Sequence, residues 1–399
     1  MSEAGVQPHV RKNVIVLAAC QALAMTGMSM IMTASALVGK MLSPDPSLAT
    51  VPLALQFAGA MITTIPASLF MGKYGRRLGF SIGQVVGALG GLMAAYAIYI
   101  QDFWLFAAAS LLIGFHVAFW QYFRFAAADS AGPEFRAKAI SYVLAGGVFA
   151  AVAGPQLGIW SQNLFQPYLF IGIYVIIIGL CLTTLLIIQA IRIPAPTSVG
   201  IVKAGRPLVE IMRQPVFIVA VMSAMLGYGT MTLVMTATPL AMEFCGFGYS
   251  DSATVIQWHI LAMYAPSFFT GDLIKRFGVL NVILAGVLLN ICAMAINLSG
   301  IDYLHFSIAL VCLGLGWNFM FIGGTTLLTE SYTPEERPKV QAANDFMVLS
   351  TTTVAAFSSG ALQHTIGWAA VNAGIAIPMS LVFFGVIWYK FIYLPKYST

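Results

Sequence analysis

The chain has 399 residues, of which 59% are hydrophobic and only 8% are charged. About a quarter of the residues of a water-soluble domain are charged, so this composition excludes a soluble globule and predicts a polytopic membrane protein. The net charge is +5, from 19 Lys and Arg against 14 Asp and Glu. The basic residues lie between apolar stretches, a pattern that indicates topology. We therefore expect the lipid bilayer as a partner and no nucleic acid.

Twelve apolar stretches follow one another, each long enough to cross about 30 Å of hydrocarbon as a helix. The first is preceded by a polar segment with Arg11 and Lys12 and is followed by no small-residue cleavage site. It is therefore interpreted as a retained helix and not as a removed signal peptide. The predicted spans are residues 13–40, 51–71, 80–100, 103–128, 139–162, 167–191, 215–243, 250–271, 279–298, 303–329, 339–364 and 368–392.

The basic residues also predict an orientation, because Lys and Arg accumulate on the cytoplasmic side of a membrane. With the N-terminus inside, all of them except Lys40 and Arg124 fall in or beside cytoplasmic segments. We expect a multi-pass protein of the bacterial inner (plasma) membrane with both termini in the cytoplasm.

The two halves of the chain resemble each other. Residues 192–214 form the longest polar break, with six spans on either side, so we expect an N-terminal half at 1–191, a cytoplasmic linker at 192–214 and a C-terminal half at 215–399. At an offset of 203 residues, Met32-Thr33-Ala34-Ser35 lies over Met235-Thr236-Ala237-Thr238. Pro133-Glu134-Phe135-Arg136 likewise matches Pro334-Glu335-Glu336-Arg337 at an offset of 201. Such a duplication is typical of secondary transporters with a substrate site near the membrane midplane.

Basic turns after the second and eighth spans make the resemblance more specific. Residues 68–77 read SLFMGKYGRR and residues 271–278 read GDLIKRFG. With twelve spans in two repeats, the chain resembles the major facilitator superfamily, whose turn reads G-x-L-x-D-R-x-G-R-R. Gly72 and Lys275 stand where that pattern has Asp, a departure from the family's Asp-centred charge lock. The candidate gating or topology residues are Lys73, Gly75, Arg76, Arg77, Lys275 and Arg276.

That resemblance implies an all-α membrane protein of twelve transmembrane helices in two pseudo-symmetric six-helix halves. In the fifth span, Gly154-Pro155-Gln156-Leu157-Gly158 also resembles the superfamily's antiporter motif. Small residues let helices approach closely and Pro permits a bend. This run is the best sequence argument for a proton-coupled exporter.

Soft donor side chains recur at a four-residue step in two neighbouring spans. The seventh span carries Met231 and Met235, and the eighth carries His259 and Met263. A four-residue step places both members of a pair on one helix face. At 1.5 Å per residue both pairs fall near the membrane midplane. Thioethers and an imidazole suit Cu(I), so the pattern favours a copper site.

Two simpler interpretations of these residues stay open. With 20 methionines in the chain, the Met pairs can be ordinary core packing. An ionisable residue at mid-depth is costly and indicates function, but a neutral His259 bonded to a backbone carbonyl or to Gln257 is the structural alternative.

The donor pattern, MxxxM in the seventh span with HxxxM in the eighth, resembles CcoA-like copper importers, which supply copper for assembly of cbb3-type cytochrome c oxidase. The resemblance implies that Met231, Met235, His259 and Met263 bind the transported copper. Spans one, four, seven and ten line the cavity in the superfamily, so further cavity residues are expected. They are Met28 and Met32, which mirror the Met pair at offset 203, and His116, Gln257 and Asn318.

We therefore expect an importer of copper, with Cu(I) favoured by the donors, working by alternating access. No nucleophile with a base and no ATP-binding loop occurs, so we expect no enzyme and no permanent cofactor. A cytoplasmic copper chaperone or exporter is the expected partner of a monomeric carrier. The alternative is a carrier of an organic solute such as riboflavin, or a proton-coupled exporter, with Trp120, Trp258, Trp317 and Tyr228 as stacking surfaces. A non-transporting scaffold or copper sensor, the coupling ion and the role of Cys245 also stay open.

Overall fold

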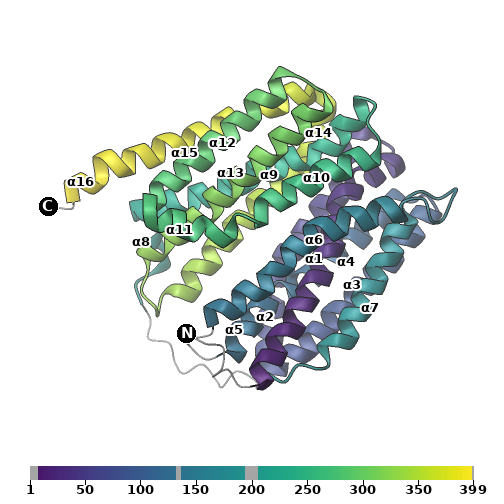
Figure 1. Ribbon diagram of the computed structural model, residues 1–399, viewed down its shortest axis with the longest axis horizontal. Helices are drawn as coiled ribbons and strands as arrows, with labels where there is room; N and C mark the ends of the chain where they lie inside the picture. The colour runs from purple at the N-terminus through teal and green to yellow at the C-terminus, as the bar shows by residue number, and fades with distance from the viewer. Residues whose placement is uncertain (1–7, 132–135, 194–204, 398–399) are drawn as a thin grey trace. The chain divides into compact units, whose positions relative to one another are not determined.

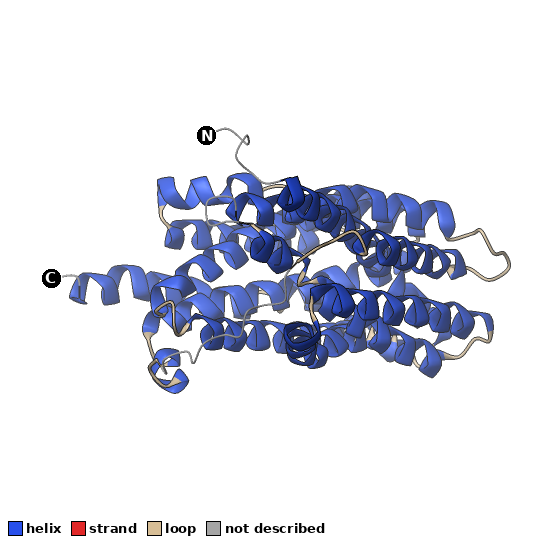
Figure 2. Cartoon of the chain, turned by 90° about the horizontal axis from the view of Figure 1, so that it is seen from below, coloured by secondary structure: helices blue, strands red, loops and turns tan. Residues whose placement is uncertain are grey.

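The structure is a computed structural model that describes residues 8–131, 136–193 and 205–397. All regular structure in these ranges is helical (Figure 2). The chain divides into two compact units, Met1–Val199 and Gly200–Thr399, and each is described by itself. Residues 194–204 of the predicted linker and Pro133-Glu134-Phe135 of the second repeat pair lie outside the described residues.

The helices of the N-terminal half follow the predicted spans closely. A short 3₁₀ helix, η2 (Pro46–Leu48), joins the first two, and the fourth span is divided in two. The helices are α1 (Pro8–Leu42), α2 (Val51–Tyr74), α3 (Arg76–Tyr99), α4 (Phe103–Trp120), α5 (Phe123–Ser130), α6 (Arg136–Ser161) and α7 (Ile171–Ile188).

The C-terminal half repeats this order with its eighth span divided. Two short 3₁₀ and π segments, η3 (Thr329–Ser331) and η4 (Tyr389–Tyr393), lie among its later helices. The helices are α8 (Leu208–Met212), α9 (Pro215–Phe244), α10 (Tyr249–Tyr264), α11 (Ser267–Phe277), α12 (Val279–Ser299), α13 (Tyr303–Leu328), α14 (Arg337–Ala373), α15 (Ala376–Trp388) and α16 (Leu394–Tyr397).

Nine helices in the described ranges are long and apolar enough to cross a membrane. The last of these runs through residues 339–393, and Gly367, at φ +79°, interrupts it between the predicted eleventh and twelfth spans. The fifth span is α6, and the eighth is the broken pair α10 and α11. The predicted fold of twelve transmembrane helices is therefore confirmed, and the protein is a multi-pass membrane protein.

The same helix pairs form the core of each half, which gives the internal repeat a structural meaning. In the N-terminal half α1 packs on α6, α2 on α4, and α3 on α4 and α7 (Figure 1). In the C-terminal half α9 packs on α14, α10 on α13, and α12 on α13 and α15. Small residues permit these contacts: a Cβ at Gly154 on α6 would lie 2.5 Å from the Ser29 Cβ on α1. The buried core of each half is therefore a tight contact between helix backbones.

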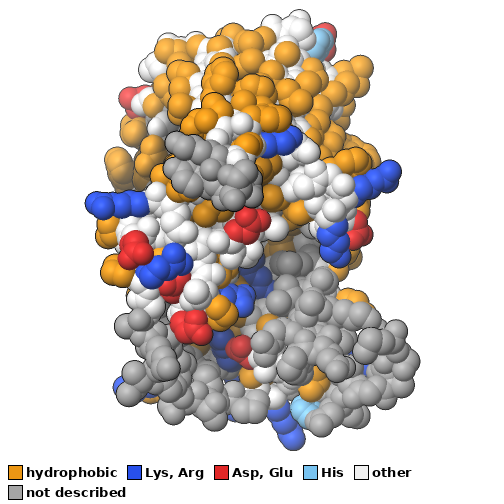
Figure 3. All heavy atoms as spheres, turned by 90° about the vertical axis from the view of Figure 1, so that its left-hand side faces the viewer, with side chains coloured by type: hydrophobic (Ala, Val, Ile, Leu, Met, Phe, Trp, Pro, Cys, Tyr) orange, Lys and Arg blue, Asp and Glu red, His pale blue; other side chains and the backbone are white. Residues whose placement is uncertain are grey.

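Two glycines at equivalent positions end the second and eighth spans. Gly75 has φ +91° and Gly278 has φ +84°, and a Cβ would meet nothing within 4 Å at either position. The backbone conformation, and not lack of space, therefore requires glycine at both turns. Charged side chains of both signs gather at the end of the C-terminal half where α8 and α11 lie (Figure 3). Lys275 and Asp272 are among the exposed residues there.

Candidate functional site

The four predicted copper ligands are all buried in the C-terminal half. Met231 and Met235 on α9 are 2% and 4% exposed, and His259 and Met263 on α10 are 0% and 5% exposed. Helices α9 and α10 contact each other and both pack against α13. The fold therefore places the two pairs on adjoining helices.

His259 is held in one tautomer by a backbone carbonyl. Its Nδ1 lies 2.7 Å from the Leu310 oxygen on α13. A carbonyl only accepts hydrogen bonds, so Nδ1 carries the proton and Nε2 keeps a lone pair. That Nε2 is buried with no partner in the structure. The backbone-bonded alternative is thus correct for one ring nitrogen, and the other has the form that metal-ligating histidines take.

Asn318 on α13 holds the break that follows this motif. Its amide nitrogen donates to the Met263 carbonyl at 2.7 Å and to the Ser267 hydroxyl at 2.8 Å, and its oxygen accepts from Thr270 at 2.6 Å. Pro266 lies in the break and lacks the N–H that would continue the helix. The structure shows Asn318 as a buried clamp on the α10–α11 junction, and the expectation that it lines the substrate cavity stays a prediction.

The N-terminal half supplies a mirror of one part of this arrangement. Gln56 and Met28 lie 203 residues before His259 and Met231. The Gln56 Nε2 donates to the Met28 sulfur at 2.8 Å. A Cβ added at Gly114 would lie 2.2 Å from the backbone carbonyl oxygen of Gln56. A Cβ added at Gly314 would lie 2.6 Å from the backbone carbonyl oxygen of His259. Gly114 and Gly314 thus let the helix pairs α2–α4 and α10–α13 approach alike.

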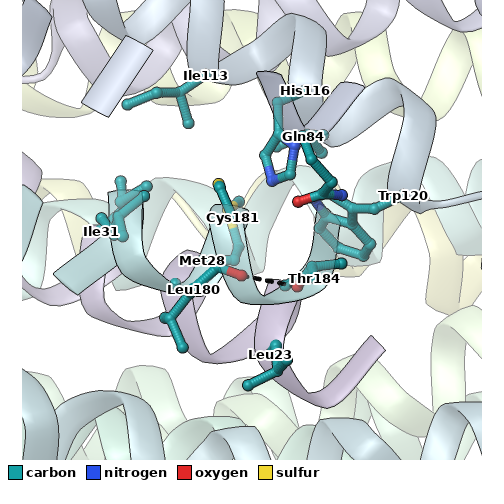
Figure 4. A pocket seen from close by; sticks show the side chains of 14 residues that line it. Leu23, Met28, Ile31, Gln84, Ile113, His116, Trp120, Leu180, Cys181 and Thr184 are labelled. Carbon is teal, nitrogen blue, oxygen red and sulfur yellow. Dashed lines mark hydrogen bonds between the residues drawn. The ribbon is translucent and has the colours of Figure 1, made fainter. Parts of the chain in front are cut away.

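A small cavity of about 20 Å³ lies among α1, α3, α4 and α7 of the same half (Figure 4). Two residues expected near the substrate path, Met28 and His116, line it, together with Gln84, Trp120 and Cys181. Cys181 and Gln84 were missed by sequence reasoning, because nothing in a single sequence indicates which helices adjoin. Met32, the second expected mirror methionine, is buried on α1, and Gln257 is partly exposed on α10.

An aromatic cluster lies on α9, α10 and α13 around Trp317. The Trp317 ring stacks on Phe321 at a centroid distance of 5.1 Å. Tyr228 and Tyr264 meet it edge-on at 5.3 and 5.9 Å. The Trp317 Nε1 is buried and has no hydrogen-bond partner in the structure. The cluster thus gathers flat aromatic faces around one buried N–H donor that has no partner.

The basic turns form different contacts in the two halves. In the N-terminal half Arg76 pairs with Asp129 of α5 at 2.7 Å, so the acid comes from the end of the fourth span and not from the turn. In the C-terminal half Lys275 pairs only loosely with Asp272 of its own helix at 3.7 Å. Lys73 and Arg276 each lie over the aromatic ring of the residue that follows.

Another ion pair joins the segment before α8 to the start of α14. The Arg206 guanidinium donates to both carboxylate oxygens of Glu336, from Nε at 2.9 Å and from Nη2 at 2.8 Å. The Arg206 and Thr333 backbone amides donate to the same carboxylate at 2.8 and 3.1 Å. The Arg206 side chain foremost, with the Thr333 amide, lowers the pKa of Glu336 to about 2. Glu336 lies in the PEERPK repeat, but its partner, far away in the chain, was not predicted.

Long apolar helices in two repeated six-helix halves are typical of a membrane transporter of the secondary type. The model for the Major Facilitator Superfamily matches residues 17–298, and the chain belongs to that family.

Its relatives and structural neighbours are transporters. The chain is 41% identical over 366 residues to the riboflavin transporter RfnT of Brucella anthropi, covering 91% of this chain and 92% of that protein. It is 29% identical to the uncharacterized MFS-type transporter YddS of Bacillus subtilis, covering 95% and 91%. The fold matches a mutant of the nucleoside transporter NupG with a TM-score of 0.75, at 13% identity and 94% and 99% coverage. It matches a D-xylose–proton symporter with a TM-score of 0.73, at 12% identity and 95% and 97% coverage.

These comparisons give no support to the expected copper importer. The named relative matches the alternative, a carrier of riboflavin or a similar organic solute.

Proposed function

We propose that this chain is a secondary transporter that moves a flavin-like organic solute by alternating access. The aromatic cluster around Trp317 carries the proposal. A flavin presents a flat ring system with carbonyl acceptors on one edge, and aromatic faces with a single N–H donor match both features. The similarity to a riboflavin transporter over nine-tenths of the chain supports the same substrate class.

Uptake of radiolabelled riboflavin into proteoliposomes that contain only this protein tests the proposal. Trp317→Leu removes the stacking face and the donor. Aromatic stacking contributes about 0.5–1.5 kcal/mol, and a lost hydrogen bond adds about 1 kcal/mol, so we expect a loss of roughly tenfold or more in apparent affinity. Trp104→Leu is the matched control, because Trp104 on α4 is 63% exposed and its ring meets that of the neighbouring Phe103, away from the Trp317 cluster. The proposal would be refuted if the parent showed no saturable riboflavin uptake, or if Trp317→Leu took up riboflavin with unchanged apparent affinity.

Copper import is a second candidate, and the orphaned Nε2 of His259 favours it. The repeat strengthens the case, because Gln56 and Met28, which correspond to His259 and Met231, are in direct contact. Neutral thioethers and an imidazole would leave the ion's charge uncompensated, so affinity would be moderate and release easy. Such an importer would serve oxidase assembly in the way the CcoA-like resemblance implies.

One set of variants separates the two candidates. The quadruple variant Met231→Leu, Met235→Leu, His259→Gln and Met263→Leu keeps the bulk of all four side chains. A copper importer would lose radiocopper uptake in this variant, and riboflavin uptake would be largely spared. Normal copper uptake by the variant would refute the ligand assignment, and no copper uptake by the parent would refute the candidate.

We also propose the bacterial inner membrane as the location, with both termini in the cytoplasm and a monomer as the working unit. The distribution of basic residues supports this orientation. Protease accessibility of N- and C-terminal tags in sealed spheroplasts tests it: both tags should be protected.

A further inference from the structure

The cavity in the N-terminal half contains polar atoms that have no partners. The Gln84 Nε2 and the Trp120 Nε1 are both buried, make no hydrogen bond in the structure, and belong to residues that line the cavity. Gln84 is 1% exposed and Trp120 is 7% exposed. Figure 4 shows both side chains gathered with His116 at one side of the cavity. Two buried donors therefore lack acceptors beside an imidazole.

His116 is prepared to accept a proton at one defined atom. Its Nδ1 lies 3.0 Å from the Gly83 carbonyl oxygen on α3. Nδ1 must therefore carry the hydrogen, and Nε2 keeps the lone pair. The residue is 6% exposed and lines the cavity. Cys181 is the only other titratable side chain among the lining residues, and no Asp, Glu, Lys or Arg is among them.

The size and polarity of the cavity select its occupant. A volume of about 20 Å³ exceeds the 10–15 Å³ that one water needs and is far below a flavin site. Met28 and Cys181 offer sulfur atoms that could bind a soft metal ion. The two unpartnered N–H groups, however, repel a bare cation and attract an atom with a lone pair. One water satisfies the set: it accepts from Gln84 and Trp120 and donates to the His116 Nε2. Three partners are typical of a buried water.

Protonation of His116 upsets this arrangement. The Nε2 gains a hydrogen and becomes a third donor facing the water, which has only two lone pairs. One donor must then lose its partner, and the imidazolium has no carboxylate among the lining residues to offset its charge. Buried unpaired donors and charges are costly. Protonation therefore favours any conformation in which the cavity opens to solvent. The proton thus binds the two conformations with different affinity, as coupling requires.

The other half has the same architecture without a titratable group. At offset 203, Gly83 and Gly87 correspond to Gly286 and Asn290. His116 fills the space beside Gly87, whose Cβ would lie 2.8 Å from the His116 Nδ1. In the C-terminal half Asn290 itself fills the space beside a glycine of α13 and donates to the Gly286 carbonyl at 2.9 Å. An amide does not take up a proton near neutral pH. Of these two equivalent arrangements, only the one with His116 in the N-terminal half can therefore respond to pH.

We propose that this cavity is a proton-binding site, with His116 taking up the coupling proton at Nε2 and Gln84 and Trp120 sensing it through one bound water. The assay below rests on the proposed flavin transport; the site does not. With one proton per substrate, an outside pH one unit lower drives about tenfold accumulation of riboflavin.

The test compares gradient-driven accumulation with counterflow in proteoliposomes. His116→Gln should keep riboflavin counterflow, and its accumulation ratio should fall from about ten to about one. Trp120→Phe removes one of the three donors, so its accumulation should fall below that of the parent. His305→Gln, the same change at a histidine outside the cavity, should accumulate riboflavin as the parent does.

Each other outcome has a defined meaning. A parent that shows counterflow but no response to the gradient, or a His116→Gln variant that still accumulates riboflavin, overturns the site. A parent without riboflavin counterflow overturns the proposed substrate, and the site is then tested by NMR of the ¹⁵N-histidine-labelled full chain. Of the five histidines, the one whose resonance is missing in His116→Gln should titrate, with a midpoint shifted by Trp120→Phe. A resonance that does not titrate, or that ignores Trp120→Phe, also overturns the site.

Discussion

Replacing Asn318 by Leu removes the clamp on the break between α10 and α11 while keeping a side chain of similar size. The amide makes three hydrogen bonds, buried ones with the Met263 carbonyl and the Thr270 hydroxyl and a part-buried one with the Ser267 hydroxyl. Hydrogen bonds between membrane helices contribute about 0.6 kcal/mol each on average. The substitution should therefore lower the free energy of unfolding by about 2 kcal/mol, or roughly twentyfold in the folded-to-unfolded ratio.

Reversible unfolding in SDS, followed by circular dichroism, measures this difference. Asn281→Leu is the matched control: Asn281 is exposed, its amide nitrogen donates to the Phe277 carbonyl of the preceding turn, and its oxygen accepts from Lys390 at the exposed surface. It should change stability by less than about 0.5 kcal/mol. Asn318→Asp keeps the acceptor for Thr270 and loses the donors, so it should also be destabilised. If Asn318→Leu were as stable as Asn281→Leu, the clamp would have no energetic role.

Two further predictions concern the ends of the helices. Gly75→Ala and Gly278→Ala should each lower the free energy of unfolding by about 1 kcal/mol, because both positions have positive φ in open space. Gly72→Ala and Gly271→Ala, at uncrowded positions inside helices, should not destabilise the protein in the same SDS assay. Equal effects in the two pairs would contradict the backbone argument. Arg206 lowers the pKa of Glu336 in the folded protein to about 2, against about 4.3 in the unfolded chain. The stabilisation from this ion pair should therefore be complete above about pH 5 and lost as the pH falls toward 2. Melting curves of Glu336→Gln should lack this acid-dependent loss, and a parent whose stability did not fall toward pH 2 would refute the pairing.

The lengths of the apolar stretches and the internal repeat predicted the fold, because hydrocarbon thickness and the need to satisfy backbone hydrogen bonds leave few choices. Every span was placed, and the turn at Gly367 falls in the gap between the last two. The break at α10–α11 was not predicted, although Pro266 lies in it. The break between α4 and α5 lies at Gln121 and Tyr122 and has no Gly or Pro to indicate it. There the Tyr122 hydroxyl bonds to the Thr64 carbonyl of α2, a tertiary contact that local sequence does not reveal.

The candidate sites were predicted only in part, because side-chain partners come from helices distant in sequence. The buried position of His259 and the correspondence of Met28 with Met231 followed from depth and repeat. The Leu310 carbonyl that fixes the His259 tautomer did not. Nor did the contact of Gln56 with Met28, since a glutamine carries no periodic signal. The methionine and histidine side chains predicted a metal site from the sequence. The helix packing shows, in addition, the Asn318 clamp, the Trp317 cluster and the small polar cavity beside His116.

The duplicated architecture explains why the two halves can divide the work of one carrier. Each half keeps a carbonyl on its third helix that accepts from a buried polar side chain: Gly83 from His116, and Gly286 from Asn290. The space beside this carbonyl is filled by a titratable imidazole in one half and by a neutral amide in the other. The C-terminal half in turn has the Trp317 cluster and the soft donors beside α13. A duplication whose polar contacts have diverged in this way can respond to protons in one half and bind substrate in the other without a change of fold.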